Sequence, residues 1–390
     1  MSAVCLRGIT WDHSRALPPL VAASQRFEEL HPGIRILWEK RSLDEFGHAG
    51  LAELSRSYDL LIIDHPMLGD AHHNHTLIDL QPLLPAEALA DLESDALGQC
   101  LASYRYENCL YALPVDAAAP AASFRPDLLE RKGHPVPADW KQVIELARRG
   151  LVRMPGFPAD IFLNLMGMCA SRGSSVASGE YLFDRAIATR CLEELRELAS
   201  LMPETIYAMN PIALYETMAS VDEFAYCPFA YIYSNYSRPG FAANILLFAN
   251  LATLSEGTPL RAVLGGTGIA ISSKCTNIEA ALDFCSFVAG RHCQSHLYGM
   301  CGGQPASNAA WRDPLLNRIS NNFFERTLES ILTASVRPRY AGYIALQRSA
   351  GMLIVEYLRH KVTAARTLQG LDNLYRQSLP ELANESEIMP

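Results

Sequence analysis

The sequence predicts an α/β protein that divides into two lobes and ends in a helical segment. Two observations support this fold class. With 390 residues, the chain is too long for one hydrophobic core and should form more than one. Its first third alternates short apolar stretches with amphipathic ones, which is the pattern of a parallel sheet covered by helices on both faces.

The first lobe is expected to begin with three strand–helix units. In chain order the patterns predict a strand at 5–11, a helix at 17–30, a strand at 34–38, a helix at 43–56, a strand at 58–63, a helix at 87–104 and a strand at 110–113. The stretch 114–120 then replaces patterned sequence with small residues and proline, so we expect a hinge there.

The second lobe is expected to be mainly helical. Its predicted elements are helices at 159–172, 184–201 and 211–219 and a strand at 223–229. An aromatic loop, Tyr231 to Tyr236, follows that strand. The tail over 315–379 is again helical.

Two glycine-rich turns bracket a strand and a helix in the segment 264–305. Gly265, Gly266 and Gly268 precede a short β segment at 269–271, and an amphipathic helix is expected at 279–288. The unit ends at Gly302-Gly303-Gln304-Pro305, where glycine breaks the helix and proline prevents its return. Glycine turns of this kind let a backbone approach a ligand closely, so we interpret this unit as part of a ligand clamp.

The order of this unit resembles the extracellular solute-binding proteins of the sugar-binding type, which are the ligand receptors of ABC transporters. Two further segments resemble the same family, FRPDLLERKGHPVPADW at 124–140 and RPRYAGY at 337–343. The resemblance implies the two-lobe periplasmic-binding-protein-like, or Venus-flytrap, fold. Its discontinuous lobes would comprise residues 1–116 with 262–314 and residues 117–261, and a helical segment at 315–390 would pack on them.

The resemblance implies a non-catalytic protein that captures a small polar solute, such as a sugar, polyol or sugar acid, by hinge closure for an ABC permease. A cytosolic enzyme or ligand sensor on the same fold stays open as the alternative, because His13, Asp64 and His65 could form an acid–base set. The sequence contains no GxSxG elbow, P-loop, strand-linked GxGxxG or CxxC motif. We expect no catalytic residue, no cofactor and no metal. His72, His73 and His75 have no recognisable fourth ligand, and the H-E-x-x-H pattern fails at His292 and His296 because Cys293 replaces its glutamate.

Residues at the carboxyl ends of the predicted parallel strands are the first candidates for ligand binding, because these ends face the crevice in such sheets. They are Trp11, Asp12 and His13 after the first strand, Arg41 after the second, and Asp64 and His65 after the third. Asp116 lies in the expected hinge. Asp12 and Asp64 could instead cap helices, and Trp11 could be a core aromatic.

The opposite wall is expected to come from the aromatic loop, through Tyr231, Tyr233, Asn235 and Tyr236, although such tyrosines can also belong to the core. The resemblance adds Gly266, Thr267, Gln304 and Arg339. Arg337 and Arg339 flank a proline, and an arginine fork matches a carboxylate. We therefore favour a solute with hydroxyl and carboxylate groups over a neutral oligosaccharide.

Composition excludes several partners. The formal charge of −9 and the lack of a basic run argue against nucleic acid, and the most apolar window, 241–254, is too short to span a membrane. A monomer is expected. The sequence as it stands shows no secretory pattern, which predicts a cytoplasmic protein, or a periplasmic one if a signal peptide has been removed. Cys100 and Cys109 could close a small loop in the second case.

Overall fold

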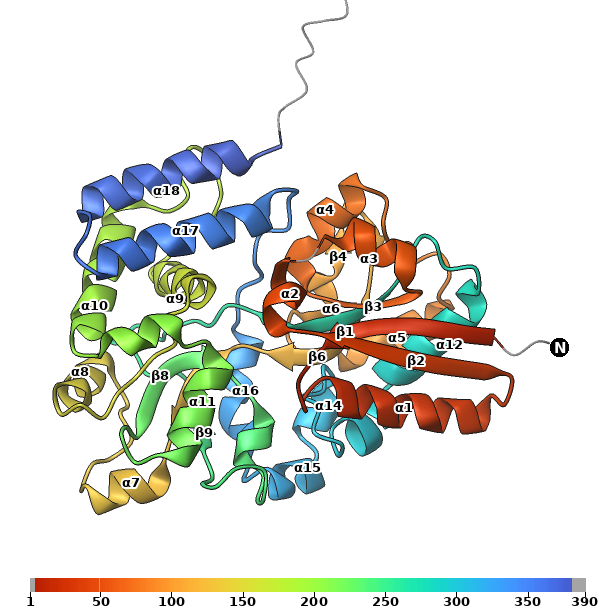
Figure 1. Cartoon of the computed structure of the whole chain (residues 1–390), viewed down its shortest axis with the longest axis horizontal. Coiled ribbons are helices and arrows are strands. Elements are labelled where there is room, and N and C mark those ends of the chain that lie inside the picture. Colours follow the sequence, from red (N-terminus) through yellow and green to blue (C-terminus); the bar gives the residue numbers. More distant parts are fainter. Residues whose placement is uncertain (1–3, 49, 381–390) are drawn as a thin grey trace, which may run out of the picture.

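The computed structural model describes residues 4–48 and 50–380 and arranges them as two α/β lobes (Figure 1). The first lobe is built on a five-stranded sheet in the order β2-β1-β3-β10-β6. These strands are β1 (Val4–Trp11), β2 (Ile34–Arg41), β3 (Leu60–Ile63), β6 (Leu113–Ala118) and β10 (Gly265–Ile271). Strand β1 pairs in parallel with β2 and β3, whereas β10 runs antiparallel to β3 and β6. The expected parallel arrangement of the first three strands is confirmed.

The remaining elements of this lobe surround the sheet. They are α1 (Leu17–Leu30), α2 (Leu43–His48), α3 (Leu51–Ser57), η1 (His65–Met67), α4 (Leu68–His73), α5 (Ala86–Asp95), α6 (Cys100–Ser103), β4 (Arg105–Tyr106), β5 (Cys109–Leu110), α12 (Ile278–Ala289), α13 (Arg291–Cys293) and the π-helix η4 (Gln294–Tyr298).

The second lobe contains a three-stranded antiparallel sheet in the order β8-β7-β9. Its elements are β7 (Pro120–Phe124), α7 (Pro126–Arg131), α8 (Trp140–Arg148), α9 (Pro158–Ser171), α10 (Arg185–Ser200), η2 (Glu204–Ala208), α11 (Pro211–Ser220), β8 (Tyr226–Tyr231), η3 (Ser234–Ser237) and β9 (Leu247–Ala249). The carboxyl-terminal helices are α14 (Asn308–Trp311), α15 (Pro314–Ile319), α16 (Phe323–Leu332), α17 (Tyr343–Leu358) and α18 (Ala364–Ser378).

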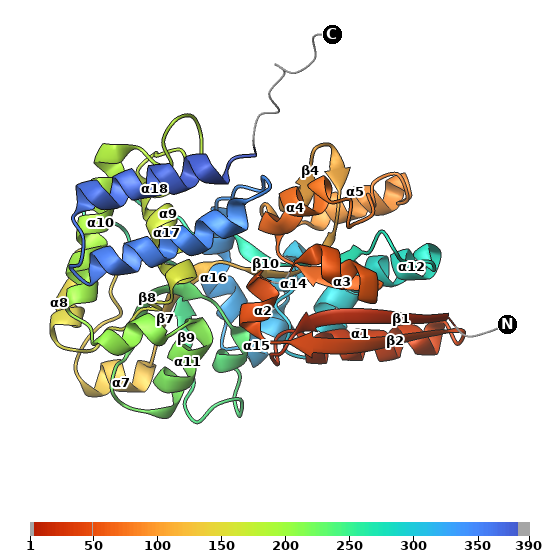
Figure 2. The same cartoon turned by 45° about the horizontal axis from the view of Figure 1, so that its top comes forward.

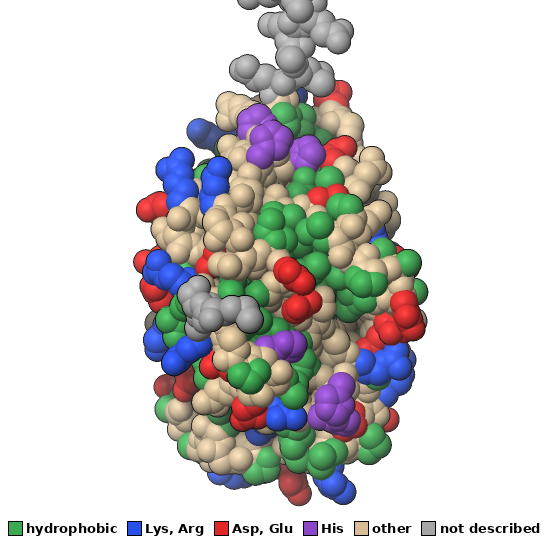
Figure 3. Space-filling model, turned by 90° about the vertical axis from the view of Figure 1, so that its right-hand side faces the viewer, with side chains coloured by type: hydrophobic (Ala, Val, Ile, Leu, Met, Phe, Trp, Pro, Cys, Tyr) green, Lys and Arg blue, Asp and Glu red, His purple; other side chains and the backbone are tan. Residues whose placement is uncertain are grey.

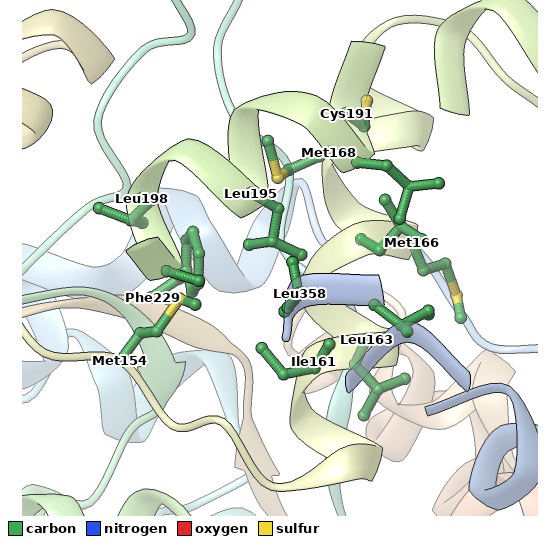
Figure 4. Close-up of a cluster of buried hydrophobic side chains, with 14 of the residues drawn as sticks. Met154, Ile161, Leu163, Met166, Met168, Cys191, Leu195, Leu198, Phe229 and Leu358 are labelled. Atoms are coloured by element: carbon green, nitrogen blue, oxygen red, sulfur yellow. The ribbon is translucent and has the colours of Figure 1, made fainter. Parts of the chain in front are cut away.

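The carboxyl-terminal helices complete two of the three hydrophobic cores. Helices α17 and α18 lie along the second lobe beside α9 and α10 (Figure 2), where Ile161, Leu195 and Leu358 belong to one buried cluster (Figure 4). A different core contains Trp311 and Phe323 together with alanines of β6 and β7. This core therefore runs from one sheet to the other.

Several element boundaries differ from the sequence prediction. The expected hinge at 114–120 is almost entirely strand, because β6 ends at Ala118 and β7 begins at Pro120. Its small residues are fully buried in the core that joins the sheets, so they lack the alternation that marks a half-exposed strand. The helix expected at 87–104 is divided into α5 and α6, since Gly98 between them has a left-handed φ of 53°.

The chain connects the two sheets at Ala119 and again between β9 and β10. The segment 333–342 lies beside the second connection, where Ser335 pairs with Val263. The lobe boundaries expected at 116/117 and 261/262 fall near these connections and stay a prediction. No helix in the described ranges is long and apolar enough to cross a membrane. On the face shown in Figure 3, acidic and basic side chains are interspersed.

Candidate functional site

The polar residues expected at the ends of β1, β2 and β3 lie at one edge of the first sheet. Trp11 and Arg41 are the last residues of neighbouring parallel strands and are directly paired in register. Asp64 follows β3, which pairs with the other side of β1. This edge faces the second lobe (Figure 1).

An ion pair that the sequence did not reveal lies at the boundary between the lobes. Arg15, just before α1, donates from Nε to Asp116 Oδ2 over 2.9 Å, and its Nη2 contacts Asp116 Oδ1. Its Nη1 donates to the carbonyl of Ile232 over 2.9 Å. Both side chains are almost completely buried. Burial disfavours the charged form of Arg15, but Asp116 outweighs it and keeps the pKa of Arg15 above its usual value.

Aromatic rings surround this pair. The guanidinium carbon of Arg15 lies 4.7 Å from the centre of the Tyr233 ring and 5.9 Å from that of Trp11. His13 packs edge-on against Tyr233 at 4.8 Å, and its Nδ1 accepts a hydrogen bond from the backbone of Arg15. Burial, with Arg15 beside it, lowers the pKa of His13 to about 4. The structure thus brings Trp11, His13, Asp116 and Tyr233 together.

A second buried cluster joins the end of β3 to the segment 333–342. Arg337 Nη2 lies 2.6 Å from both carboxylate oxygens of Asp64, and Arg337 Nε donates to the carbonyl of Leu264. His65 Nε2 accepts from the backbone of Arg337 at 3.3 Å. Burial alone would raise the pKa of Asp64, but Arg337 outweighs it and holds this pKa at about 2. Asp64 is therefore an ion-pair partner rather than a helix cap.

Other predicted residues contact the protein backbone or surface groups. Asp12 is exposed and pairs with Lys40 at 2.9 Å. Tyr231 donates to the carbonyl of Val263, and Tyr236 donates to Glu216. Gln304 accepts from Ser234 N and donates to the carbonyl of Ala117. Arg339 Nη1 donates to the carbonyls of Ala102, Ser103 and Arg105. Their roles toward a ligand stay a prediction.

Two predicted residues lie in the buried interior beside these groups. Thr267 is 3% exposed, and its hydroxyl has no hydrogen-bond partner among the described residues. Asn235 is equally buried, and its amide nitrogen lies close to Gly302. Gly266 has a φ of 101°, and a Cβ added there would lie 2.2 Å from the carbonyl oxygen of Asp116.

Arg15 and Asp160 were not among the site residues predicted from the sequence. Asp160 lies in the first turn of α9, and burial raises its pKa to about 7. It is near enough to Tyr231 and Tyr233 to influence both hydroxyls. An acidic residue after the proline that opens a helix is an ordinary helix-start pattern, so the sequence held no signal for a site residue there.

The histidine clusters noted in the sequence lie apart from these groups. His72 Nδ1 lies 2.6 Å from the hydroxyl of Tyr111, and the rings of His292 and His296 are 4.8 Å apart. Within the described ranges no group of three potential metal ligands occurs. All ten cysteines, including Cys100 and Cys109, are free thiols.

We expect His65 to make folding stability depend on pH. Burial, with Arg337 beside it, lowers the pKa of His65 to about 4, below the value of about 6.5 in an unfolded chain. The neutral ring therefore stabilises the fold fully above pH 6.5, and this contribution is lost as the pH falls toward 4, by about 1.4 kcal/mol per pH unit.

His13 and Asp160 also titrate between about pH 4 and 7. The contribution of His65 is therefore measured as the difference in free energy of unfolding between the native protein and a His65 variant. Both proteins, the native form and His65→Gln, are unfolded with urea at pH 7, 5.5 and 4.5. The difference between their free energies of unfolding should become smaller as the pH falls. His73→Gln, at an exposed histidine, should keep the native pH profile. A difference independent of pH would contradict this assignment.

Comparison with known proteins agrees with this architecture. The sequence profile of the family described as bacterial extracellular solute-binding protein matches residues 10–291. Comparison with curated proteins finds no relative. Among solved structures, maltose-bound MalE3 of T. maritima superimposes with a TM-score of 0.81 at 17% identity, covering 97% of this chain and 100% of that one.

Two further similar structures are solute-binding proteins of ABC transporters. That of Thermotoga lettingae, bound with α-D-tagatose, has a TM-score of 0.83 at 14% identity and covers 97% of this chain and 100% of that one. That of Agrobacterium vitis, with bound D-mannitol, has a TM-score of 0.77 at 16% identity and covers 96% and 98%. At these identities the likeness establishes the two-lobe fold.

Proposed function

Because the chain belongs to the bacterial extracellular solute-binding proteins, we propose that it captures a small polar solute between its two lobes and releases it chemically unchanged. The solute is a sugar, a polyol or a sugar acid. The observation that carries this proposal is the packing of His13 and Arg15 from the first lobe on Tyr233 from the second, with the ring of Trp11 beside Arg15.

The chemistry of this group suits a polyhydroxylated solute. An indole or phenol ring covers the CH face of a sugar, while imidazole and phenol groups exchange hydrogen bonds with hydroxyls. Because burial keeps the pKa of His13 at about 4, the ring is neutral at pH 7. Its Nδ1 is an acceptor from the backbone of Arg15, so its Nε2 carries the proton and can donate to a ligand.

Capture would couple to hinge rotation at the connections between the sheets. Tyr231 and Arg337 both donate to carbonyls of the segment between β9 and β10, so the neighbouring connections are tied together there. A ligand shifts the balance between open and closed forms only by the contacts that it gains on closure. We expect an ABC permease to recognise the closed monomer, in the periplasm if the protein is exported.

Two lines support a polyhydroxylated solute. Maltose, tagatose and mannitol are bound in the similar structures described above. The boundary between the lobes supplies both aromatic faces and hydrogen-bonding groups. Two residues that the enzyme alternative needs as acid and base make structural contacts instead. His65 accepts a hydrogen bond from the backbone of Arg337, and Asp64 forms an ion pair with the same residue.

The test is a thermal-shift screen against sugars, polyols and their acids, followed by calorimetry on the hits. One compound at about 100 times its Kd should stabilise the native state by about 2.7 kcal/mol. Tyr233→Ala should abolish that shift, while Tyr181→Ala, at an exposed tyrosine, should retain it. Mass spectrometry should recover the compound unchanged. A panel without any hit, or a chemically altered compound, would overturn the proposal.

A further inference from the structure

Trp11, Arg41 and Phe46 form a compact cluster at the carboxyl ends of β1 and β2, which we call the Arg41 cluster. The ring centres of Trp11 and Phe46 are 5.1 Å apart, and the guanidinium carbon of Arg41 lies 5.3 Å from the Phe46 ring. The three residues are 3%, 8% and 7% exposed. A guanidinium held this deeply needs a partner.

Three nitrogen atoms of the Arg41 cluster have no hydrogen-bond partner among the described residues. They are Nε1 of Trp11 and both Nε and Nη2 of Arg41. Within the described part of the chain, the guanidinium donates one hydrogen bond, a long one from Nη1 to the carbonyl of Glu45 at 3.3 Å. All three are donors, so the group that satisfies them must offer acceptors.

The unpaired edge of Arg41 is the edge that other arginines of this protein use to hold a carboxylate. Arg15 uses Nε and Nη2 toward Asp116. Arg125 uses the same two atoms toward Asp127, at 2.7 and 2.6 Å. This side-on fork fits the two oxygens of a carboxylate, and such a charge-assisted pair is among the stronger hydrogen-bonded contacts.

Described carboxylates close to Arg41 in the sequence are engaged by other groups. Glu39 accepts from Arg7 and Tyr58, and Glu45 accepts from the backbone and hydroxyl of Ser42. Asp12 pairs with Lys40. At the lobe boundary, Arg15 and Arg337 are neutralised by Asp116 and Asp64. None of these carboxylates is hydrogen-bonded to Arg41. The charge of Glu45 acts on Arg41, but burial outweighs it and lowers the pKa of Arg41 to about 10, so the cation still lacks a direct carboxylate partner among these neighbours.

We propose that the Arg41 cluster binds the carboxylate of the captured solute, which makes the solute a polyhydroxylated monocarboxylate such as an aldonic or uronic acid. This inference rests on the proposed function. The cluster adjoins the lobe boundary through Trp11, whose ring lies 5.9 Å from Arg15. One positive charge without a direct carboxylate partner suits a monoanion better than a phosphate dianion. Arg41, rather than Arg337 or Arg339, then carries the acid selectivity expected from the sequence.

The test compares each acid with its neutral counterpart on the native protein by calorimetry. The pairs are D-gluconate with D-glucitol, D-galacturonate with D-galactose, and D-glucuronate with D-glucose. At least one acid should bind about tenfold or more tightly than its counterpart, as expected for a charge-assisted pair. Tighter binding of the neutral compounds would overturn the inference and leave the proposed function intact. Binding of neither class would overturn both.

Variants assign the selectivity to the cluster. Arg41→Gln should lose about tenfold or more in affinity for the preferred acid, whereas Arg35→Gln, an exposed arginine of the same strand, should bind as the native protein does. Trp11→Phe keeps a ring and removes one donor, so a loss of roughly fivefold is expected even if Arg41→Gln does not fold. Unchanged acid affinity in a folded Arg41→Gln or in Trp11→Phe would contradict the proposal.

Discussion

Replacing Arg15 with methionine is expected to lower the free energy of unfolding by about 3–5 kcal/mol, the cost of removing one partner from a buried ion pair. The change leaves the Asp116 carboxylate buried without its cation and the carbonyl of Ile232 without its donor. Urea unfolding measures the loss. Because Arg15 also packs on Tyr233, the variant should bind the solute poorly.

A double variant separates the stranded charge from the lost packing. In Arg15→Met with Asp116→Asn, the buried carboxylate is gone, so about half of the lost stability should return. A single variant that loses less than about 1 kcal/mol would show that the pair is solvated. A double variant as unstable as the single one would place the cost in packing instead.

Replacing Gly266 with alanine is expected to cost about 3 kcal/mol or more, through backbone strain and overpacking together. Gly266 has a φ of 101°, a conformation that residues with a Cβ atom rarely adopt. A Cβ added there would lie 2.2 Å from the carbonyl oxygen of Asp116. Gly33→Ala is the control, because an added Cβ there meets nothing within 4 Å.

The stability of Gly266→Ala is measured as the urea concentration at the unfolding midpoint. Solute affinity is measured on the folded variant protein. Since β10 and β6 are adjacent at this point, the substitution should also displace Asp116 and weaken binding. A stability within about 0.5 kcal/mol of the Gly33→Ala value would show that the strand relaxes without strain.

The edge of the first sheet was predictable from the sequence, whereas the ion pair of Arg15 with Asp116 at the lobe boundary was not. Strand periodicity placed Trp11 and Asp64 at strand ends and Arg41 three residues past the strand expected at 34–38, which extends to Arg41 in the structure. Parallel pairing brings these ends together. Arg15 and Asp116 are 101 residues apart in the sequence, and no pattern around either residue predicts that they pair. A serine and an arginine before a helix predict only a helix start.

The strands that flank the connection at Ala119 were not predicted, for a related reason. Periodicity detects a strand through contrast between a buried and an exposed face, and the alanines of β6 and β7 are buried on both faces. The segment 264–305 was recognisable because its glycines and proline have a fixed local meaning. In contrast, the missing partners of Nε and Nη2 of Arg41 could not be predicted from the sequence, because they depend on how the folded chain packs around the guanidinium.

The crystal structure of the protein with the tightest-binding compound of the screen would show directly where the solute binds. We expect the compound to lie between the lobes, in contact with Trp11 and Tyr233 and with its carboxylate on Nε and Nη2 of Arg41. A compound bound by one lobe alone, or away from these residues, would contradict the account.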